Sequence, residues 1–157
     1  DNIRFGKLDA TMDEIETVCR LVNAHEFIIS MEDGYNSEVG EGGSRLSSGQ
    51  KQLLSFARAL IADPKIIVLD EATASIDTQT EVRILKAIEV LLQDRTAIVV
   101  AHRLSTIVNA DKILVIDEGK IIEEGTHQQL INQKGQYYHL YTNQFAQDKE
   151  DQLLRRL

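Results

Sequence analysis

Cysteine and basic charge are scarce in this sequence, and each scarcity excludes a class of protein. The single cysteine, Cys19, cannot form an internal disulfide, so we expect an inert buried thiol and a reducing, cytosolic compartment. Lys and Arg total 17 against 25 Asp and Glu, which gives a net charge of −8, and the basic residues are scattered. Because nucleic-acid-binding proteins carry a basic stripe, we expect no nucleic-acid partner.

Long apolar runs are also missing. A stretch such as Ala97 to Ala101 has about five residues, whereas a helix needs roughly 20 to cross a bilayer, so we expect this segment itself to be soluble. The chain opens with Asp1-Asn2-Ile3, without an initiator Met and without a charged region followed by an apolar one. We therefore expect no signal peptide, and we interpret the chain as a fragment. With 157 residues and 43% hydrophobic side chains, one globular domain is the default.

Hydrophobic periodicity predicts alternating helices and strands. Thr11 and Glu14 have capping-box spacing ahead of a helix over 12–24, and the glycine-rich segment 33–49 is predicted to be a loop. A continuous aliphatic run over 66–69 is typical of a strand buried on both faces of a parallel sheet. The remaining expected elements are a helix over 50–61, a helix around Ile84 to Leu92, a strand over 97–101, a hairpin over 113–124, a short helix after Thr126, a helix over 136–145 and a frayed tail over 147–157. This order predicts an α/β fold.

Polar residues follow both predicted parallel strands. Asp70 and Glu71 end the first strand, and His102 directly follows the second. Ligands of parallel α/β sheets bind outside the carboxyl ends of the strands, so these side chains are candidates for a site. Taken singly, each also fits a structural role, as a helix cap, a solvated strand end or a hydrogen-bonded histidine.

A third candidate lies between the glycine loop and the following helix. The segment Leu46-Ser47-Ser48-Gly49-Gln50 offers two hydroxyls and free backbone N–H groups at the positive end of a helix, which suits a phosphate. Ser47 is equally a good helix N-cap. Local chemistry fits both interpretations.

In combination and in this order, these motifs closely resemble the ATP-binding cassette (ABC) family, especially the nucleotide-binding domains of membrane exporters. Leu46 to Gln50 resembles the signature motif, Ile66 to Glu71 the Walker B strand, Ala74 to Asp77 the D-loop and Ala101 to Thr106 the switch-histidine segment. Glu38-Val39-Gly40-Glu41 is similar to the exporter loop that touches the transmembrane coupling helices. Gly125-Thr126-His127 with Leu130 matches the usual ending of the family, so the resemblance covers roughly residues 1 to 145.

The resemblance implies ATP and Mg²⁺ as ligands and assigns a role to each candidate residue. Asp70 would hold Mg²⁺ directly or through water, and Glu71 would orient or deprotonate the attacking water. His102 would hydrogen-bond the γ-phosphate. Ser47, Ser48, Gly49 and Gln50 would meet the ATP of a second cassette, with Asp77 near the same interface, so that a homodimer or heterodimer is the catalytic unit.

Three features of the family, the P-loop, the adenine-stacking aromatic and the Q-loop, are expected to lie outside this sequence. A P-loop needs Gly-x-x-x-x-Gly-Lys-Ser/Thr, but Gly6-Lys7 precedes Leu8 and Gly119-Lys120 precedes Ile121. We therefore expect a P-loop NTPase-like parallel-sheet core with a helical signature subdomain, incomplete at the N-terminus, which alone binds ATP poorly and hydrolyses essentially none. The expected division is a helical signature subdomain over 1–62, the C-terminal part of the catalytic core over 63–146 and a charged tail over 147–157.

Two positions depart from the family pattern. Ser48 stands where the family usually has glycine, and it could weaken the contact with the opposing ATP or add a hydroxyl donor. Gly42 stands where many exporters have arginine, so the details of coupling to the membrane domain stay open. The leading hypothesis is the ATPase part of an exporter on the cytoplasmic face of the cell membrane, joined to an N-terminal transmembrane domain. The alternatives are a soluble ABC ATPase without transport and a non-catalytic cassette that donates only its signature motif.

Overall fold

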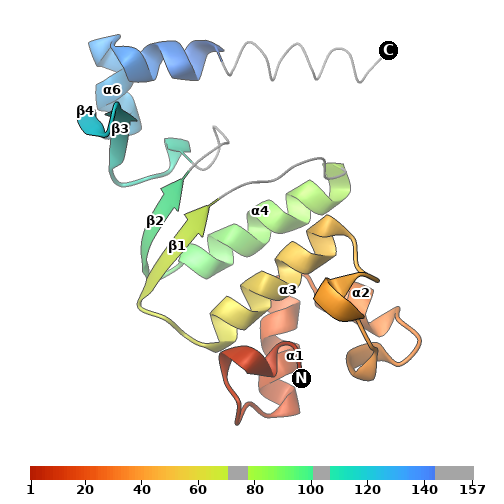
Figure 1. Ribbon diagram of the computed structural model, residues 1–157. Coiled ribbons are helices and arrows are strands. Elements are labelled where there is room, and N and C mark those ends of the chain that lie inside the picture. The colour runs from red at the N-terminus through yellow and green to blue at the C-terminus, as the bar shows by residue number, and fades with distance from the viewer. Residues whose placement is uncertain (71–77, 101–106, 144–157) are drawn as a thin grey trace, which may run out of the picture. The chain divides into compact units, whose positions relative to one another are not determined.

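The computed structural model of the chain describes residues 1–70, 78–100 and 107–143 (Figure 1). The chain divides into two compact units, Asp1–Val99 and Val100–Leu157, and each is described by itself. The domain boundary expected after residue 62 stays a prediction.

The first unit combines helices with a pair of strands. Its elements are the 3-10 turn Arg4–Gly6, α1 (Met12–Leu21), α2 (His25–Ile29), the 3-10 turns Gly34–Asn36 and Glu41–Gly43, α3 (Ser48–Ile61), β1 (Ile66–Asp70), α4 (Thr78–Leu92) and β2 (Thr96–Val100). β1 and β2 form one sheet and run in the same direction, with α4 as the crossover between them (Figure 1). The predicted α/β architecture with a parallel sheet is confirmed.

Helix α1 begins where predicted and ends three residues earlier than predicted. Thr11 accepts a hydrogen bond from the Glu14 amide, and the Glu14 side chain accepts one from the Thr11 amide, which completes the capping box. The helix ends because Asn23 adopts a left-handed conformation with φ of 58°. The Ala24 amide then reaches back to the Cys19 carbonyl at 2.7 Å, as in a Schellman motif, and the chain turns into α2.

Helix α3 lies between α1 and α4 at the centre of the core of this unit (Figure 1). Its fully or nearly fully buried side chains include Leu53 and Ala57, which meet Cys19 of α1 and Ile84 of α4 in one apolar cluster. Burial also raises the pKa of the Cys19 thiol to about 11, so the thiol is uncharged at neutral pH. The prediction of a buried, unreactive cysteine agrees with this environment.

The sheet of the first unit is covered on one face only. Ile67 is buried against the helices, whereas Ile66 and Val68 are 64% and 67% exposed. Ile98 of β2 is 59% exposed as well. The prediction that the first strand is buried on both faces is therefore wrong for the described residues: alternate side chains point to opposite faces, and the helices of this unit cover only the face that carries Ile67.

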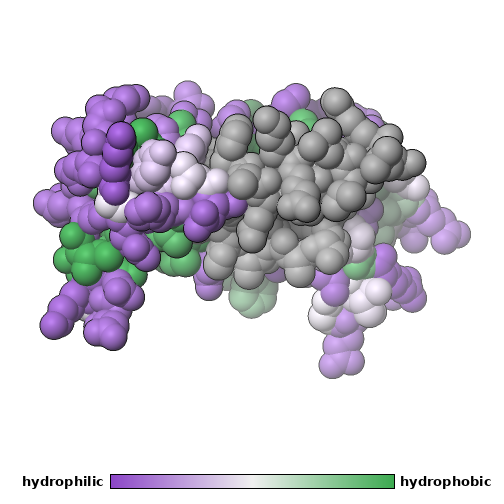
Figure 2. Space-filling view, turned by 90° about the horizontal axis from the view of Figure 1, so that it is seen from above, coloured by the Kyte–Doolittle hydropathy of each residue, from purple (hydrophilic) through white to green (hydrophobic). Residues whose placement is uncertain are grey.

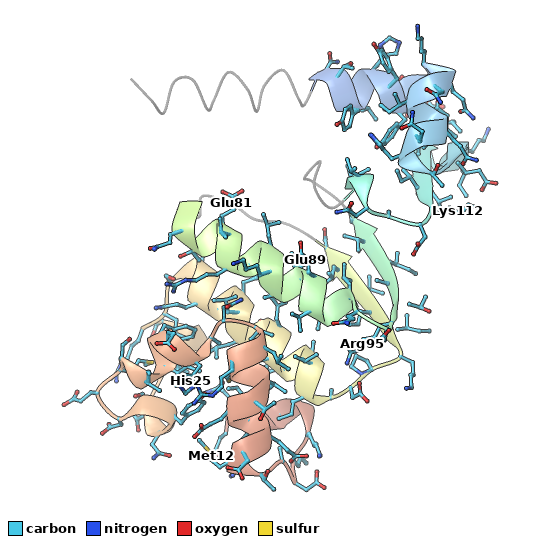
Figure 3. The ribbon with its side chains drawn as sticks, turned by 180° about the vertical axis from the view of Figure 1, so that it is seen from behind. Met12, His25, Glu81, Glu89, Arg95 and Lys112 are labelled. Atoms are coloured by element: carbon cyan, nitrogen blue, oxygen red, sulfur yellow. The ribbon has the colours of Figure 1, made fainter. Side chains whose placement is uncertain are left out.

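Arg95 ties together the two loops that lead into the strands. It lies where α4 leads into β2 (Figure 3), and its guanidinium binds the Asp63 carboxylate at 2.8 Å. The same group donates to the Leu91 and Gln93 carbonyls. Because Asp63 stands at the end of α3, this ion pair fixes the start of β1 relative to the start of β2.

The second unit is built on a β-hairpin. β3 (Ile113–Asp117) and β4 (Lys120–Gly125) pair antiparallel, as predicted, and Glu118 and Gly119 form the turn with φ of 46° and 76°. α6 (His127–Gln133) follows, and residues 136–143 are helical. Val115, Leu130 and Tyr137 form the small core of this unit.

The helix over 136–143 is capped from the hairpin. The Glu123 carboxylate on β4 accepts hydrogen bonds from the amides of Gln136 and Tyr137 at 2.6 and 2.9 Å. A carboxylate at a helix N-terminus also interacts favourably with the helix dipole. Across the part of the chain that the structure describes, no helix combines the length and the apolar character needed to cross a membrane.

Candidate functional site at the start of helix α3

The segment singled out from the sequence forms the N-terminus of α3. Ser47 is the N-cap, and its hydroxyl accepts a hydrogen bond from the Gln50 amide at 3.2 Å. In return, Oε1 of Gln50 accepts one from the Ser47 amide at 3.0 Å. The two side chains therefore complete a reciprocal capping box, and the structural interpretation of Ser47 as a helix cap is confirmed.

The cap does not use every donor at this helix end. The first N–H groups of any α-helix lack a partner inside the helix, and here the capping box accounts for that of Gln50. The amides of Ser48 and Gly49 keep no intrahelical partner, and they point out of the positive end of a helix of 14 residues. This arrangement suits a phosphate or carboxylate group.

The side chains at this helix start differ in exposure. Ser47 and Ser48 are exposed, Gln50 is half-buried and Gly49 is buried. The Ser48 hydroxyl is therefore accessible to any group that approaches the helix N-terminus. The glycine that the family usually has at this position would offer no such hydroxyl. Further along α3, the apolar side chains pack in the core of the first unit.

The loop ahead of α3 is folded on itself. The Arg45 amide donates to the Val39 carbonyl at 3.1 Å, and the Leu46 amide donates to the Gly43 carbonyl at 2.9 Å. Gly42 has φ of 58°, a conformation that residues with a side chain rarely adopt, and a Cβ atom there would meet open space. Glycine in place of arginine at this position thus fits the local backbone conformation, and it leaves the loop surface there without a side chain.

Asp70 is placed as predicted, at the carboxyl end of β1, with an exposed side chain. Within residues 1–70, 78–100 and 107–143, no three His, Cys, Asp or Glu side chains gather as a metal-binding group. A single exposed carboxylate nevertheless fits Mg²⁺, because that ion is commonly held by one or two carboxylates together with substrate phosphates and water. The predicted site residues Glu71, Asp77 and His102 lie outside the described residues.

Sequence reasoning missed a polar contact inside the first unit. Nδ1 of His25, the first residue of α2, lies 2.9 Å from the hydroxyl of Tyr35, which lies in the loop between α2 and α3. A histidine and a tyrosine ten residues apart have no helical or strand spacing, so no local pattern could have paired them.

The comparisons with known proteins all match ABC transporters. A family model described as "ABC transporter" matches residues 9–74. An uncharacterized ABC transporter ATP-binding protein of Bacillus subtilis (strain 168), YknV, is 55% identical over 146 residues, which cover 93% of this chain and 24% of that protein. A putative multidrug export ATP-binding/permease protein of Staphylococcus aureus (strain bovine RF122 / ET3-1) is 51% identical over 144 residues, which cover 92% of this chain and 25% of that protein.

A solved structure is similar over the same extent. It is described as a bacterial Atm1-family ABC exporter with ATP bound, and it is 40% identical with a TM-score of 0.80. The match covers 91% of this chain and 25% of that chain. The chain thus spans about a quarter of the length of the relatives that it matches.

Proposed function

Because this chain belongs to the ABC transporter family as a part of its ATP-binding domain, we propose that it serves ATP hydrolysis at a dimer of cassettes and couples that hydrolysis to export across a membrane. The observation that carries the proposal is the likeness, at 40% identity and a TM-score of 0.80, to an exporter with ATP bound. The capped helix N-terminus and the carboxylate at the end of β1 support the proposal, because they are a suitable anion site and a suitable Mg²⁺ ligand.

The proposed site is made by two cassettes. On this chain, Ser47, Ser48, Gly49 and Gln50 form the N-terminus of α3 and would bind the phosphates of an ATP held by the second cassette. Asp77 would lie near the same interface. Since the P-loop motif is absent from these residues, the phosphate cradle has to come from elsewhere in the full protein.

The catalytic roles fall to residues after the two strands. Asp70 would hold Mg²⁺ with its carboxylate, and the ion when bound neutralises charge on the phosphates. Glu71 would orient the attacking water and take its proton, and His102 would donate a hydrogen bond to the γ-phosphate. Water would thus be placed to attack the γ-phosphorus opposite the oxygen that links it to ADP, and the bond to that oxygen would break to release ADP and phosphate.

Reading the gene upstream of residue 1 tests the exporter proposal. We expect a P-loop of the form Gly-x-x-x-x-Gly-Lys-Ser/Thr and, further upstream, several apolar stretches of roughly 20 residues each. A P-loop without apolar stretches would overturn the transport part and point to an ABC ATPase that acts away from membranes. If the gene encodes no P-loop either upstream or downstream of these residues, the ATPase proposal itself would be overturned.

Two equivalent helix caps allow the role of Ser47 in ATP binding to be separated from its role in stability. Thr126 caps α6 with the same capping box, here with Gln129, and Ser47→Ala and Thr126→Ala should each destabilise the fold by about 1 kcal/mol. Only Ser47→Ala removes a donor to the phosphates of ATP, so we expect ATP turnover of the full-length protein to fall by about tenfold in this variant alone. Steady-state ATPase rates at saturating and limiting ATP measure the difference.

The comparison has a clear opposite outcome. Equal turnover in the Ser47→Ala and Thr126→Ala variants would mean that the Ser47 hydroxyl serves the helix cap only, and the assignment of this residue to ATP binding would be withdrawn.

A further inference from the structure

Tyr35 lies in the loop that separates α2 from α3 and makes a polar contact with α2. It sits in the 3-10 turn Gly34–Asn36, and its ring packs against the apolar core of the first unit. Its hydroxyl lies 2.9 Å from Nδ1 of His25, the first residue of α2.

The partner of this hydroxyl is deeply placed. His25 is 8% exposed, and Figure 3 shows it among the helices of the first unit. The phenol has one hydrogen, which it can donate to Nδ1 when the imidazole carries its own hydrogen on Nε2. Burial and the neighbouring thiol of Cys19 raise the pKa of Tyr35, which keeps its proton on the oxygen.

Beyond Tyr35, short-range hydrogen bonds hold together the loop that leads to α3. The Ser37 amide donates to Gly34, the Arg45 amide to Val39 and the Leu46 amide to Gly43, so each contact joins residues of the loop to one another. Such local hydrogen bonds shape the loop, and the partly buried Leu46 packs against the core of the first unit. The Tyr35 hydroxyl adds a polar contact between the loop and α2, because its partner His25 is the first residue of that helix.

We propose that Tyr35 is a positioning residue whose hydroxyl, held by His25, anchors the loop over residues 34–46 and thereby sets where Ser47 and the start of α3 meet ATP. The ATP part of this proposal rests on the proposed function, whereas the anchoring part does not. Within residues 1–70, 78–100 and 107–143, no hydrogen bond joins Tyr35 to the capping box of Ser47 and Gln50. Tyr35 acts through the loop.

The second unit supplies a matched control. His127 and Tyr137 are also ten residues apart, and Nδ1 of His127 lies 2.7 Å from the Tyr137 hydroxyl. Tyr137→Phe removes a hydrogen bond of the same kind from a different unit. Any effect of losing a buried tyrosine hydroxyl in general should appear in both variants.

Limited trypsin digestion of the full-length protein tests the anchoring directly. Cleavage after Arg45, an exposed residue of the loop, is measured by mass spectrometry relative to cleavage after the exposed Lys134 of the second unit. Because proteolysis follows the population of the open loop, losing this buried hydrogen bond should raise the relative rate about tenfold in Tyr35→Phe and His25→Phe. His25→Asn, whose amide can occupy the place of Nδ1, should restore the wild-type rate, and Tyr137→Phe should leave it unchanged.

Steady-state kinetics of the same variants test the link to ATP. We expect KM for ATP to rise several-fold in Tyr35→Phe while kcat stays within about twofold, since the loop affects where ATP is met and not the water or the base. Relative cleavage after Arg45 within about twofold of wild type, or an equal rise in Tyr137→Phe, would overturn the anchoring. A normal KM despite faster cleavage would overturn the positioning role. A wild-type protein without ATP turnover would overturn the proposed function and this role with it, while the digestion would still judge the anchor.

Discussion

Glu71→Gln in the full-length protein is expected to lower ATP turnover by roughly a thousandfold while ATP still binds. The proposed role of this carboxylate is to orient the attacking water and accept its proton, and glutamine keeps the shape but is a far poorer base. Steady-state phosphate release measures the turnover, and equilibrium binding of a fluorescent ATP analogue measures the affinity.

Glu89→Gln is the matched control for this substitution. Glu89 lies exposed on α4, as Figure 3 shows. Its substitution is the same chemical change, from carboxylate to amide, at a position away from the strand end. Its turnover should match the wild type. If Glu71→Gln also turned over ATP at the wild-type rate, the chain would be the non-catalytic partner that lends only the N-terminus of α3 to a second cassette.

Ile84→Ala is expected to lower the free energy of unfolding by about 2 to 5 kcal/mol, because the substitution leaves a cavity that its neighbours fill only in part. Ile84 lies on α4, has no exposed surface and joins the core that α1 and α3 share. Since proteins of this size are stable by only about 5 to 15 kcal/mol, this single change would remove a large share of the stability. Urea unfolding followed by circular dichroism measures the loss.

Val82→Ala on the same helix separates burial from helix propensity. Val82 is 48% exposed, so the substitution should change the free energy of unfolding by less than about 1 kcal/mol. A loss below about 1 kcal/mol for Ile84→Ala as well would contradict the placement of α4 against α3.

The helices of the first unit could be predicted from side-chain chemistry with small errors at their ends. The capping box at Thr11 and the apolar face through Cys19 and Val22 give α1 its start and its buried side. Its end depends on the left-handed backbone at Asn23, which apolar periodicity does not register. For the same reason α3 was predicted from Gln50, although it begins at Ser48: polar residues in the first turn carry no apolar signal.

The strands were found from their aliphatic runs, but their surroundings were not. A run such as Ile66 to Leu69 indicates a strand, and only the packing of helices decides how many faces of the sheet are covered. The hairpin was easier, because Glu118-Gly119 is a turn signal between two apolar segments.

One part of the candidate site could be predicted from the sequence, and other parts could not. The helix cap by Ser47 and Gln50 follows from local chemistry and is present in the structure. The contact of Tyr35 with His25 joins the loop to α2, so it depends on tertiary packing and not on spacing. The roles of Glu71, Asp77 and His102 stay predictions that rest on the family resemblance.

The uncovered aliphatic side chains on β1 and β2 affect how the chain responds to temperature. The heat capacity of unfolding grows with the apolar surface that unfolding newly exposes, and a fully packed chain of 157 residues would reach about 2 kcal/mol/K. Ile66, Val68 and Ile98 are already in contact with water in the folded chain, and Figure 2 shows other hydrophobic residues at the surface among hydrophilic ones. The heat capacity change should therefore be smaller, and the curve of stability against temperature should be flatter than for a fully packed domain of this length.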